Sequence, residues 1–244
     1  LYYLYLFNPA LIISAMIKAI LLDVDNTLVD FEGMKEKAIE ASVRALLDTG
    51  LKMPFTEAYE KLTQAYWEEG IESNTWLSAF LSKYDKIDEI KIAAATNAYR
   101  KIKQAYLEPY PTVLPTLIKL IKKGIKLGII SDAPKLKVLK RVDNLKLLSF
   151  FDAIVTEANK PSKEGFEKAL SLLIVAPQET IMIGDWPEKD LAGAKALGIK
   201  TCYARYGSKL RAVQNPDSDY TINSFSEIID ILEKENNQNE TARV

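Results

Sequence analysis

Residues 19–27 read Ala-Ile-Leu-Leu-Asp-Val-Asp-Asn-Thr, and their pattern indicates the class of fold. Residues 19–24 make a short apolar run that ends in acids, with Asp23 inside its end and Asp25 just after it. Such runs are typical of strands that are buried on both faces of a parallel sheet. In sheets of this kind ligands bind beyond the carboxyl ends of the strands. Asp23 and Asp25 are therefore candidates for chemistry.

Further along the chain, short apolar runs alternate with amphipathic stretches. The sequence predicts strands at 126–130, 153–156, 180–183 and 200–203, and helices at 112–123, 135–144, 162–173 and 189–197. Strands separated by helices of this length indicate a parallel sheet with right-handed crossovers. We therefore expect an α/β fold, with a Rossmann-like, doubly wound parallel sheet as its core.

Residues 31–109 interrupt this alternation, because they contain only helical patterns, at 34–48, 56–69, 75–83 and 86–106. The sequence thus predicts an all-helical cap inserted after the first strand. The expected division is an N-terminal extension at 1–15, a core at 16–30 and 110–234, a cap at 31–109 and a frayed polar tail at 235–244.

The composition restricts the chemistry. The 244 residues include 32 Lys and Arg against 33 Asp and Glu, no histidine and a single cysteine. A balanced charge offers no general attraction for nucleic acid or an anionic membrane. Without histidine, Ser-His-Asp catalysis and histidine-ligated metals are excluded, and one cysteine excludes cysteine-cluster zinc sites. Carboxylate chemistry with a hard cation such as Mg²⁺ is favoured.

The first fifteen residues are apolar but do not have the pattern of a targeting segment. They lack the basic start of a signal peptide and contain Asn8 and Pro9. The apolar stretch is interrupted by Lys18 and is followed by acids, so it is too short for a transmembrane helix. We expect an extension outside the domain and a cytoplasmic protein that binds no membrane.

Polar groups follow four of the predicted strands. The first strand leads to Asp23, Asp25 and Thr27, the second to Ser131 and Asp132, the third to Lys160 and Pro161, and the fourth to Gly184, Asp185 and Asp190. Each group alone is weak evidence, because Asp and Ser are common at strand ends and helix caps. Their order, each after a separate strand, predicts one site at one edge of the sheet.

This set of motifs resembles the haloacid dehalogenase superfamily over about residues 16–234. Asp-x-Asp-x-Thr stands at Asp23, Asp25 and Thr27, and the Ser of the second motif matches Ser131. The Lys-Pro pair with a later aromatic residue matches Lys160, Pro161 and Phe166, and the last motif matches Gly184, Asp185 and Asp190. The helical insert is similar to the family's first type of cap.

The resemblance implies a role for each site residue. Asp23 would attack phosphorus and form an aspartyl-phosphate, and Asp25 would act as general acid and base. Asn26, Ser131, Asp132 and Lys160 would bind the substrate, with Asn26 either donating to phosphate or shaping the turn. Mg²⁺ would be held by Asp23, the Asp25 carbonyl and Asp185. Asp190 is a further candidate ligand, but the resemblance favours a role in orienting Lys160 or a metal-bound water.

The resemblance favours a phosphatase acting on a small phosphorylated metabolite. Asp25 argues against a dehalogenase, because a halide needs no proton. A phosphomutase and a non-catalytic binding protein remain alternatives, but every position that carries chemistry is intact. Some archaeal relatives with a similar cap are glyceraldehyde 3-phosphate phosphatases, and phosphoglycolate is another familiar substrate of the family. The oligomeric state is not predicted.

Overall fold

The computed structural model describes residues 16–70, 73, 75–207, 209–210 and 212–241. The chain divides into two compact units. Of the described residues, those up to Val29 and from Pro109 onward form the α/β unit. The helical unit spans Asp30–Glu108, where the sequence predicts an insert at 31–109. The predicted extension at 1–15 lies outside the described residues.

The α/β unit is built on one sheet, whose strands are all parallel. Its strands are β1 (Ala19–Leu22), β2 (Lys126–Ile130), β3 (Ala153–Val155), β4 (Thr180–Gly184), β5 (Lys200–Ala204) and β6 (Tyr220–Ile222). They lie in the order β3-β2-β1-β4-β5-β6. This is the order of a doubly wound Rossmann-like sheet, so the predicted fold class is confirmed.

Strand β1 occupies the middle of the sheet and all four of its residues are buried. Leu22 pairs with Ile129 of β2 on one side and with Ile183 of β4 on the other. The direction of winding changes between β1 and β4, which makes their carboxyl ends the place where a ligand is expected. The Asp23 amide donates to the Ile183 carbonyl at 3.0 Å, so the two strand ends stay level.

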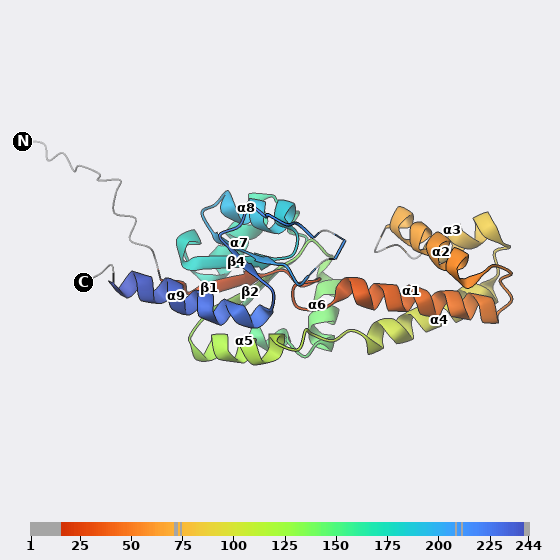
Figure 1. The fold of residues 1–244 in the computed structure, drawn as a ribbon, viewed down its shortest axis with the longest axis horizontal. Helices are drawn as coiled ribbons and strands as arrows, with labels where there is room; N and C mark the ends of the chain where they lie inside the picture. Colours follow the sequence, from red (N-terminus) through yellow and green to blue (C-terminus); the bar gives the residue numbers. More distant parts are fainter. Residues whose placement is uncertain (1–15, 71–72, 74, 208, 211, 242–244) are drawn as a thin grey trace, which may run out of the picture. The chain divides into compact units, whose positions relative to one another are not determined.

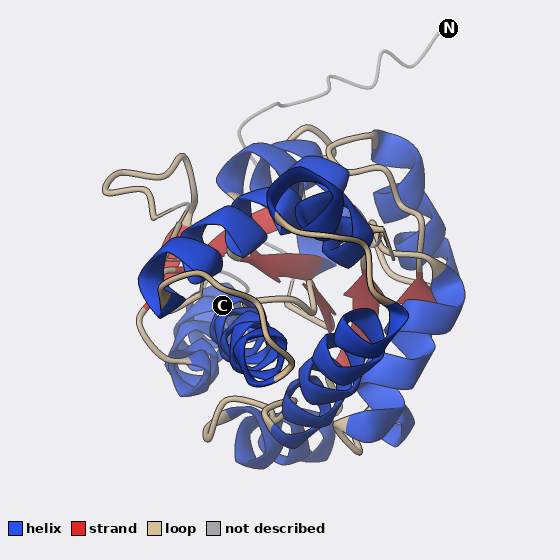
Figure 2. Cartoon of the chain, turned by 90° about the vertical axis from the view of Figure 1, so that its right-hand side faces the viewer, coloured by secondary structure: helices blue, strands red, loops and turns tan. Residues whose placement is uncertain are grey.

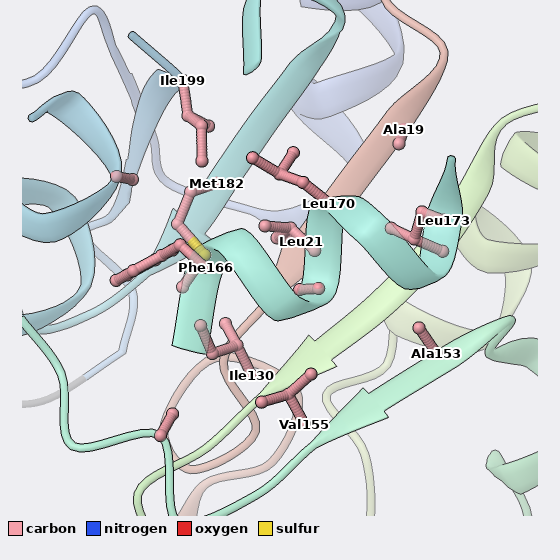
Figure 3. Close-up of a cluster of buried hydrophobic side chains, with 13 residues drawn as sticks. Ala19, Leu21, Ile130, Ala153, Val155, Phe166, Leu170, Leu173, Met182 and Ile199 are labelled. Atoms are coloured by element: carbon pink, nitrogen blue, oxygen red, sulfur yellow. The ribbon is translucent and has the colours of Figure 1, made fainter. Parts of the chain in front are cut away.

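Helices cover both faces of the sheet, with α7 (Lys163–Leu173) and α8 (Ala192–Lys195) on one side and α5 (Val113–Lys122) and α9 (Ile228–Thr241) on the other (Figure 1; helices are blue and strands red in Figure 2). The face under α7 holds an apolar cluster in which Phe166, Leu170 and Leu173 lie over Leu21 and Met182 (Figure 3). Burial of these side chains fixes α7 on the sheet.

Three elements differ from the sequence prediction. Strand β6 was not predicted, because a run of three residues is too short to show the hydrophobic pattern of a strand. The predicted helix at 189–197 is instead a π-helical turn, Pro187–Leu191, followed by the short helix α8. Helix α9 continues to Thr241 through residues predicted to fray. Within this stretch, buried Glu235 accepts hydrogen bonds from Lys200 at 2.6 Å and from Tyr220.

The helical unit consists, in its described residues, of α1 (Phe31–Asp48), α2 (Phe55–Glu69), α3 (Trp76–Tyr84) and α4 (Glu89–Ala105). Asp30 and Asp88 cap the first and last of these helices through side-chain bonds to backbone amides, at 2.9 Å to Gly33 and 2.8 Å to Ile90. The unit has its own apolar cluster, centred on Leu62, Tyr66 and Phe80. It is therefore a compact body with a core of its own.

The remaining helix of the α/β unit, α6 (Lys135–Asn144), follows the turn after β2. In the part of the chain that the structure describes, no helix combines the length and the apolar character needed to span a membrane.

Leu173 and Leu172 are neighbours on α7 that test this packing. Leu173 is buried against Leu21 and the sheet, whereas 54% of Leu172 is exposed. We expect Leu173→Ala to lower the free energy of unfolding by about 2–5 kcal/mol, since it leaves a cavity. Leu172→Ala should change it by roughly 0.5 kcal/mol or less. Urea denaturation measures the free energy of unfolding of both variants, and amide exchange of the sheet locates the loss of stability. Equal losses in the two variants would contradict this packing.

Candidate active site

Lys160 is the centre of the site at the carboxyl edge of the sheet. Its ammonium is buried and donates to Asp23 Oδ1 at 2.6 Å, to Asp190 Oδ1 at 2.6 Å and to the Ile130 carbonyl at 3.2 Å. A lysine ammonium has three donors, and here all three are used. Lys160 thus joins the ends of β1 and β2 to the turn after β4.

Asp23 is almost fully buried in this environment. Burial raises the pKa of its carboxyl well above the usual range, the neighbouring carboxyls Asp190, Asp185 and Asp25 raise it further, and Lys160 opposes the rise. For Lys160, burial alone would lower the pKa of the ammonium. Asp190 and Asp23 outweigh burial, so the pKa of Lys160 lies above its usual value and the side chain stays charged.

The turn after β1 is held by its own backbone. Asn26 has φ 61°, a left-handed conformation that asparagine tolerates better than most residues. The backbone N–H of Asn26 donates to the Val29 carbonyl at 2.8 Å, and the backbone N–H of Leu28 donates to the Val24 carbonyl at 2.9 Å. The Asn26 side chain donates to Asp185 Oδ2 at 3.4 Å. Asn26 therefore shapes the turn and contacts the acid that follows β4.

The turn after β4 brings Asp185 and Asp190 into the site, and both are buried. Asp190 Oδ2 accepts a hydrogen bond from the Trp186 amide at 3.0 Å, while its other oxygen accepts from Lys160. Two glycines make room for this packing. A Cβ on Gly184 would lie 2.4 Å from Asp190 Oδ2, and one on Gly207 would lie 2.6 Å from Asp185 Cβ.

Ser131 and Asp132 form the turn after β2. The buried Ser131 hydroxyl oxygen accepts a hydrogen bond from the Ala133 amide at 3.2 Å. Asp132 Oδ1 accepts from the Lys160 amide at 2.7 Å, and its Oδ2 accepts from Lys189 Nζ at 3.2 Å. Asp132 therefore fixes the backbone at Lys160, and its role as a substrate-binding residue stays a prediction.

Two basic residues of the site were not predicted. Arg141 of α6 is buried and forms an ion pair with the Asp25 carboxylate. Lys189 bonds to Asp132 and lies 4.3 Å from the centre of the Trp186 ring. Arg141 could have been noticed in the sequence, because it occupies a position in the buried stripe of α6 with Val138 and Val142.

The same carboxylates can hold a divalent metal ion. Asp23, Asp185 and Asp190 are buried, and each offers an oxygen within 4.8 Å of the others. Lys160 pairs with Asp23 and Asp190 in the same place. An all-oxygen set of carboxylate donors suits a hard divalent cation. The described residues of the site therefore fit such an ion.

Most of the predicted site residues lie together. Asp23, Lys160 and Asp190 are joined directly, Asn26 contacts Asp185, and Asp132 contacts the Lys160 backbone. Ser131 follows Ile130, whose carbonyl accepts from Lys160. Asp25 is turned to Arg141.

Comparisons with known proteins agree with this geometry. Residues 20–204 match the family model described as haloacid dehalogenase-like hydrolase. The chain is 34% identical to a glyceraldehyde 3-phosphate phosphatase of Methanocaldococcus jannaschii, over 89% of this chain and 97% of that protein. It is 32% identical to the protein of that name from Pyrococcus furiosus, over 90% and 95%.

Among solved structures, the fold is similar to that of a HAD phosphatase from Thermococcus onnurineus. The two chains are 27% identical and superpose with a TM-score of 0.62, over 88% of this chain and 98% of that one. With the family model, the relatives and the site in agreement, this chain belongs to the haloacid dehalogenase-like hydrolases.

Proposed function

We propose that the chain is a Mg²⁺-dependent phosphomonoester phosphatase that works through an aspartyl-phosphate on Asp23. The observation that carries the proposal is the buried contact between the Asp23 carboxylate and Lys160 at the carboxyl end of the central strand. A buried carboxylate beside a permanent positive charge can approach an anionic phosphate that would otherwise repel it.

The reaction would proceed through two displacements at phosphorus, the first by Asp23 and the second by water. Asp23 Oδ attacks phosphorus while the bond to the leaving oxygen breaks, and Asp25 donates the proton that this oxygen needs. Asp25 then takes a proton from a water that attacks the same phosphorus, which releases inorganic phosphate and restores Asp23. The Lys160 ammonium would exchange one of its three present acceptors for a phosphoryl oxygen, and the Ser131 hydroxyl would bind another. Asn26 would hold Asp185.

Mg²⁺ would be held by the carboxylates of Asp23 and Asp185 and by the Asp25 carbonyl, and when bound it supplies positive charge that balances the phosphoryl oxygens. We assign Asp190 to orienting Lys160, since its two oxygens already accept from Lys160 and from the Trp186 amide.

For the substrate we propose a small phosphorylated metabolite, with glyceraldehyde 3-phosphate as the first candidate. The support is the name shared by the archaeal relatives, which match nearly the whole length of this chain. The test is phosphate release from a panel of triose, glycolate and sugar phosphates, each with Mg²⁺ and with EDTA. Metal-dependent release that is fastest from glyceraldehyde 3-phosphate supports the proposal. A folded protein that releases phosphate from none of them contradicts it.

Asp23→Asn should abolish turnover, because an amide cannot serve as the nucleophile, while the fold remains. Phosphate release and circular dichroism measure the two effects. Exposed Asp217, with 86% of its side chain exposed, provides the control substitution Asp217→Asn, which should leave turnover unchanged. Near-normal turnover of Asp23→Asn would remove Asp23 from the role of nucleophile.

Asp25→Ala should lower turnover by about 10²–10⁴-fold, the usual contribution of a general acid–base group. Because the second step also needs Asp25, protein labelled by the phosphate group should accumulate during the reaction. Acid-quenched samples with radiolabelled substrate measure this label. Normal hydrolysis by Asp25→Ala would reject the acid–base assignment.

Asp185→Asn should weaken metal binding while it keeps the volume of the side chain. We expect the Mg²⁺ concentration needed for half-maximal activity to rise about tenfold or more, as the loss of one charged ligand implies. Isothermal titration with Mg²⁺ gives a second measurement that does not depend on turnover. Unchanged metal binding would show that Asp185 is not a ligand.

A further inference from the structure

Arg141 is a charged residue in the buried face of α6, where it lies between Val138 and Val142 in the last two turns of the helix. Only 6% of its side chain is exposed. Its guanidinium Nη1 donates to Oδ2 of Asp25, which is 116 residues earlier in the chain. A buried arginine is costly unless an anion accompanies it, so this pairing is a fixed feature of the unit.

The partner of Arg141 is the carboxylate to which the proposed function gives the proton transfers. Asp25 keeps 29% of its side chain exposed, so the pair restrains it while part of it remains accessible. A guanidinium is planar and presents its donors in a fixed direction, so it constrains where a carboxylate lies more strongly than an ammonium does. It also stays charged throughout the working pH range of proteins.

We propose that Arg141 is the positioning residue for Asp25: it fixes the carboxylate where it can reach the leaving oxygen. This inference rests on the proposed phosphatase activity and goes beyond it, since Arg141 has no part in the family motifs quoted above. Arg141 acts through Asp25 and is not assigned a contact with the substrate.

Positioning of an acid has a kinetic signature that a purely structural role lacks. An alkyl leaving oxygen needs a proton as its bond to phosphorus breaks, whereas a nitrophenolate leaves without one. The value of kcat/KM reports the first displacement, in which the leaving group departs. A misplaced Asp25 should therefore slow an alkyl ester far more than an aryl ester of similar size.

The experiment compares benzyl phosphate with 4-nitrophenyl phosphate, with Mg²⁺ present. Arg141→Met removes the charge and keeps most of the side-chain volume. Arg141→Lys keeps the charge but replaces the planar guanidinium by an ammonium. Lys140→Met is the matched control, because Lys140 is the exposed neighbour of Arg141 on the same helix. Each variant is also combined with Asp25→Asn, and thermal unfolding shows whether it is folded.

For Arg141→Met we expect kcat/KM to fall about 10- to 100-fold on benzyl phosphate, as a small displacement of a catalytic group can cause, and about threefold or less on 4-nitrophenyl phosphate. Arg141→Lys should recover part of the loss, and Lys140→Met should resemble the unmodified protein. In the Asp25→Asn background, loss of Arg141 should add little on either ester.

Equal losses on the two esters, or losses that persist in full in the Asp25→Asn background, would overturn the inference and leave Arg141 a structural residue. Unchanged activity of Arg141→Met would overturn it as well. If the unmodified protein hydrolyses neither these esters nor any phosphorylated metabolite, the proposed function itself fails. That result is distinct from a normal enzyme whose ester preference does not depend on Arg141.

Discussion

The ammonium of Lys160 holds the carboxyl edge of the sheet together. It uses its three donors on Asp23, Asp190 and the Ile130 carbonyl, so it neutralises buried acids and ties together segments that follow three different strands. Among the described residues, the base that pairs with Asp23 and with Asp190 is Lys160. Proteins avoid buried carboxylates without a base by protonation or by opening. A protonated Asp23 could not attack phosphorus. The same ion pairs therefore serve the fold and the chemistry.

The doubly wound sheet supplies the geometry for this contact. Because β1 lies between β2 and β4, their carboxyl ends deliver Asp23, Ser131 and Asp185 to one edge, and short turns complete the site. Close packing is possible because Gly184 and Gly207 have no side chains to clash with Asp190 and Asp185. Asp23, Asp185 and Asp190 also bring carboxylate oxygens close together at this edge. Such oxygens are the ligands that a hard divalent cation prefers, and this is the physical reason to expect metal dependence.

The sequence predicted the sheet's central strands and most of the site because both depend on local signals. A buried parallel strand is a short apolar run, and the motif residues stand directly after such runs. The missed features depend on contacts that no short pattern shows. Strand β6 pairs with β5, and the π-helical turn at Pro187–Leu191 is closed by a bond from the Ala192 amide to the Pro187 carbonyl. Helices α1 and α4 have different starts from the predicted ones because Asp30 and Asp88 cap them, a signal that was readable. The pairing of Arg141 with Asp25 could not be predicted from the sequence, because no local pattern tells which distant acid a buried arginine contacts.

The most direct test of the account is a crystal structure of the protein with Mg²⁺ and beryllofluoride, which imitates a phosphoryl group attached to a carboxylate. We expect beryllium to be bonded to an Asp23 oxygen, Lys160 to contact the fluorides, and Asp23 and Asp185 to hold Mg²⁺. An adduct on another carboxylate, or beryllofluoride bound without a bond to Asp23 in a protein that hydrolyses phosphate esters, would contradict the central claim that Asp23 is the nucleophile.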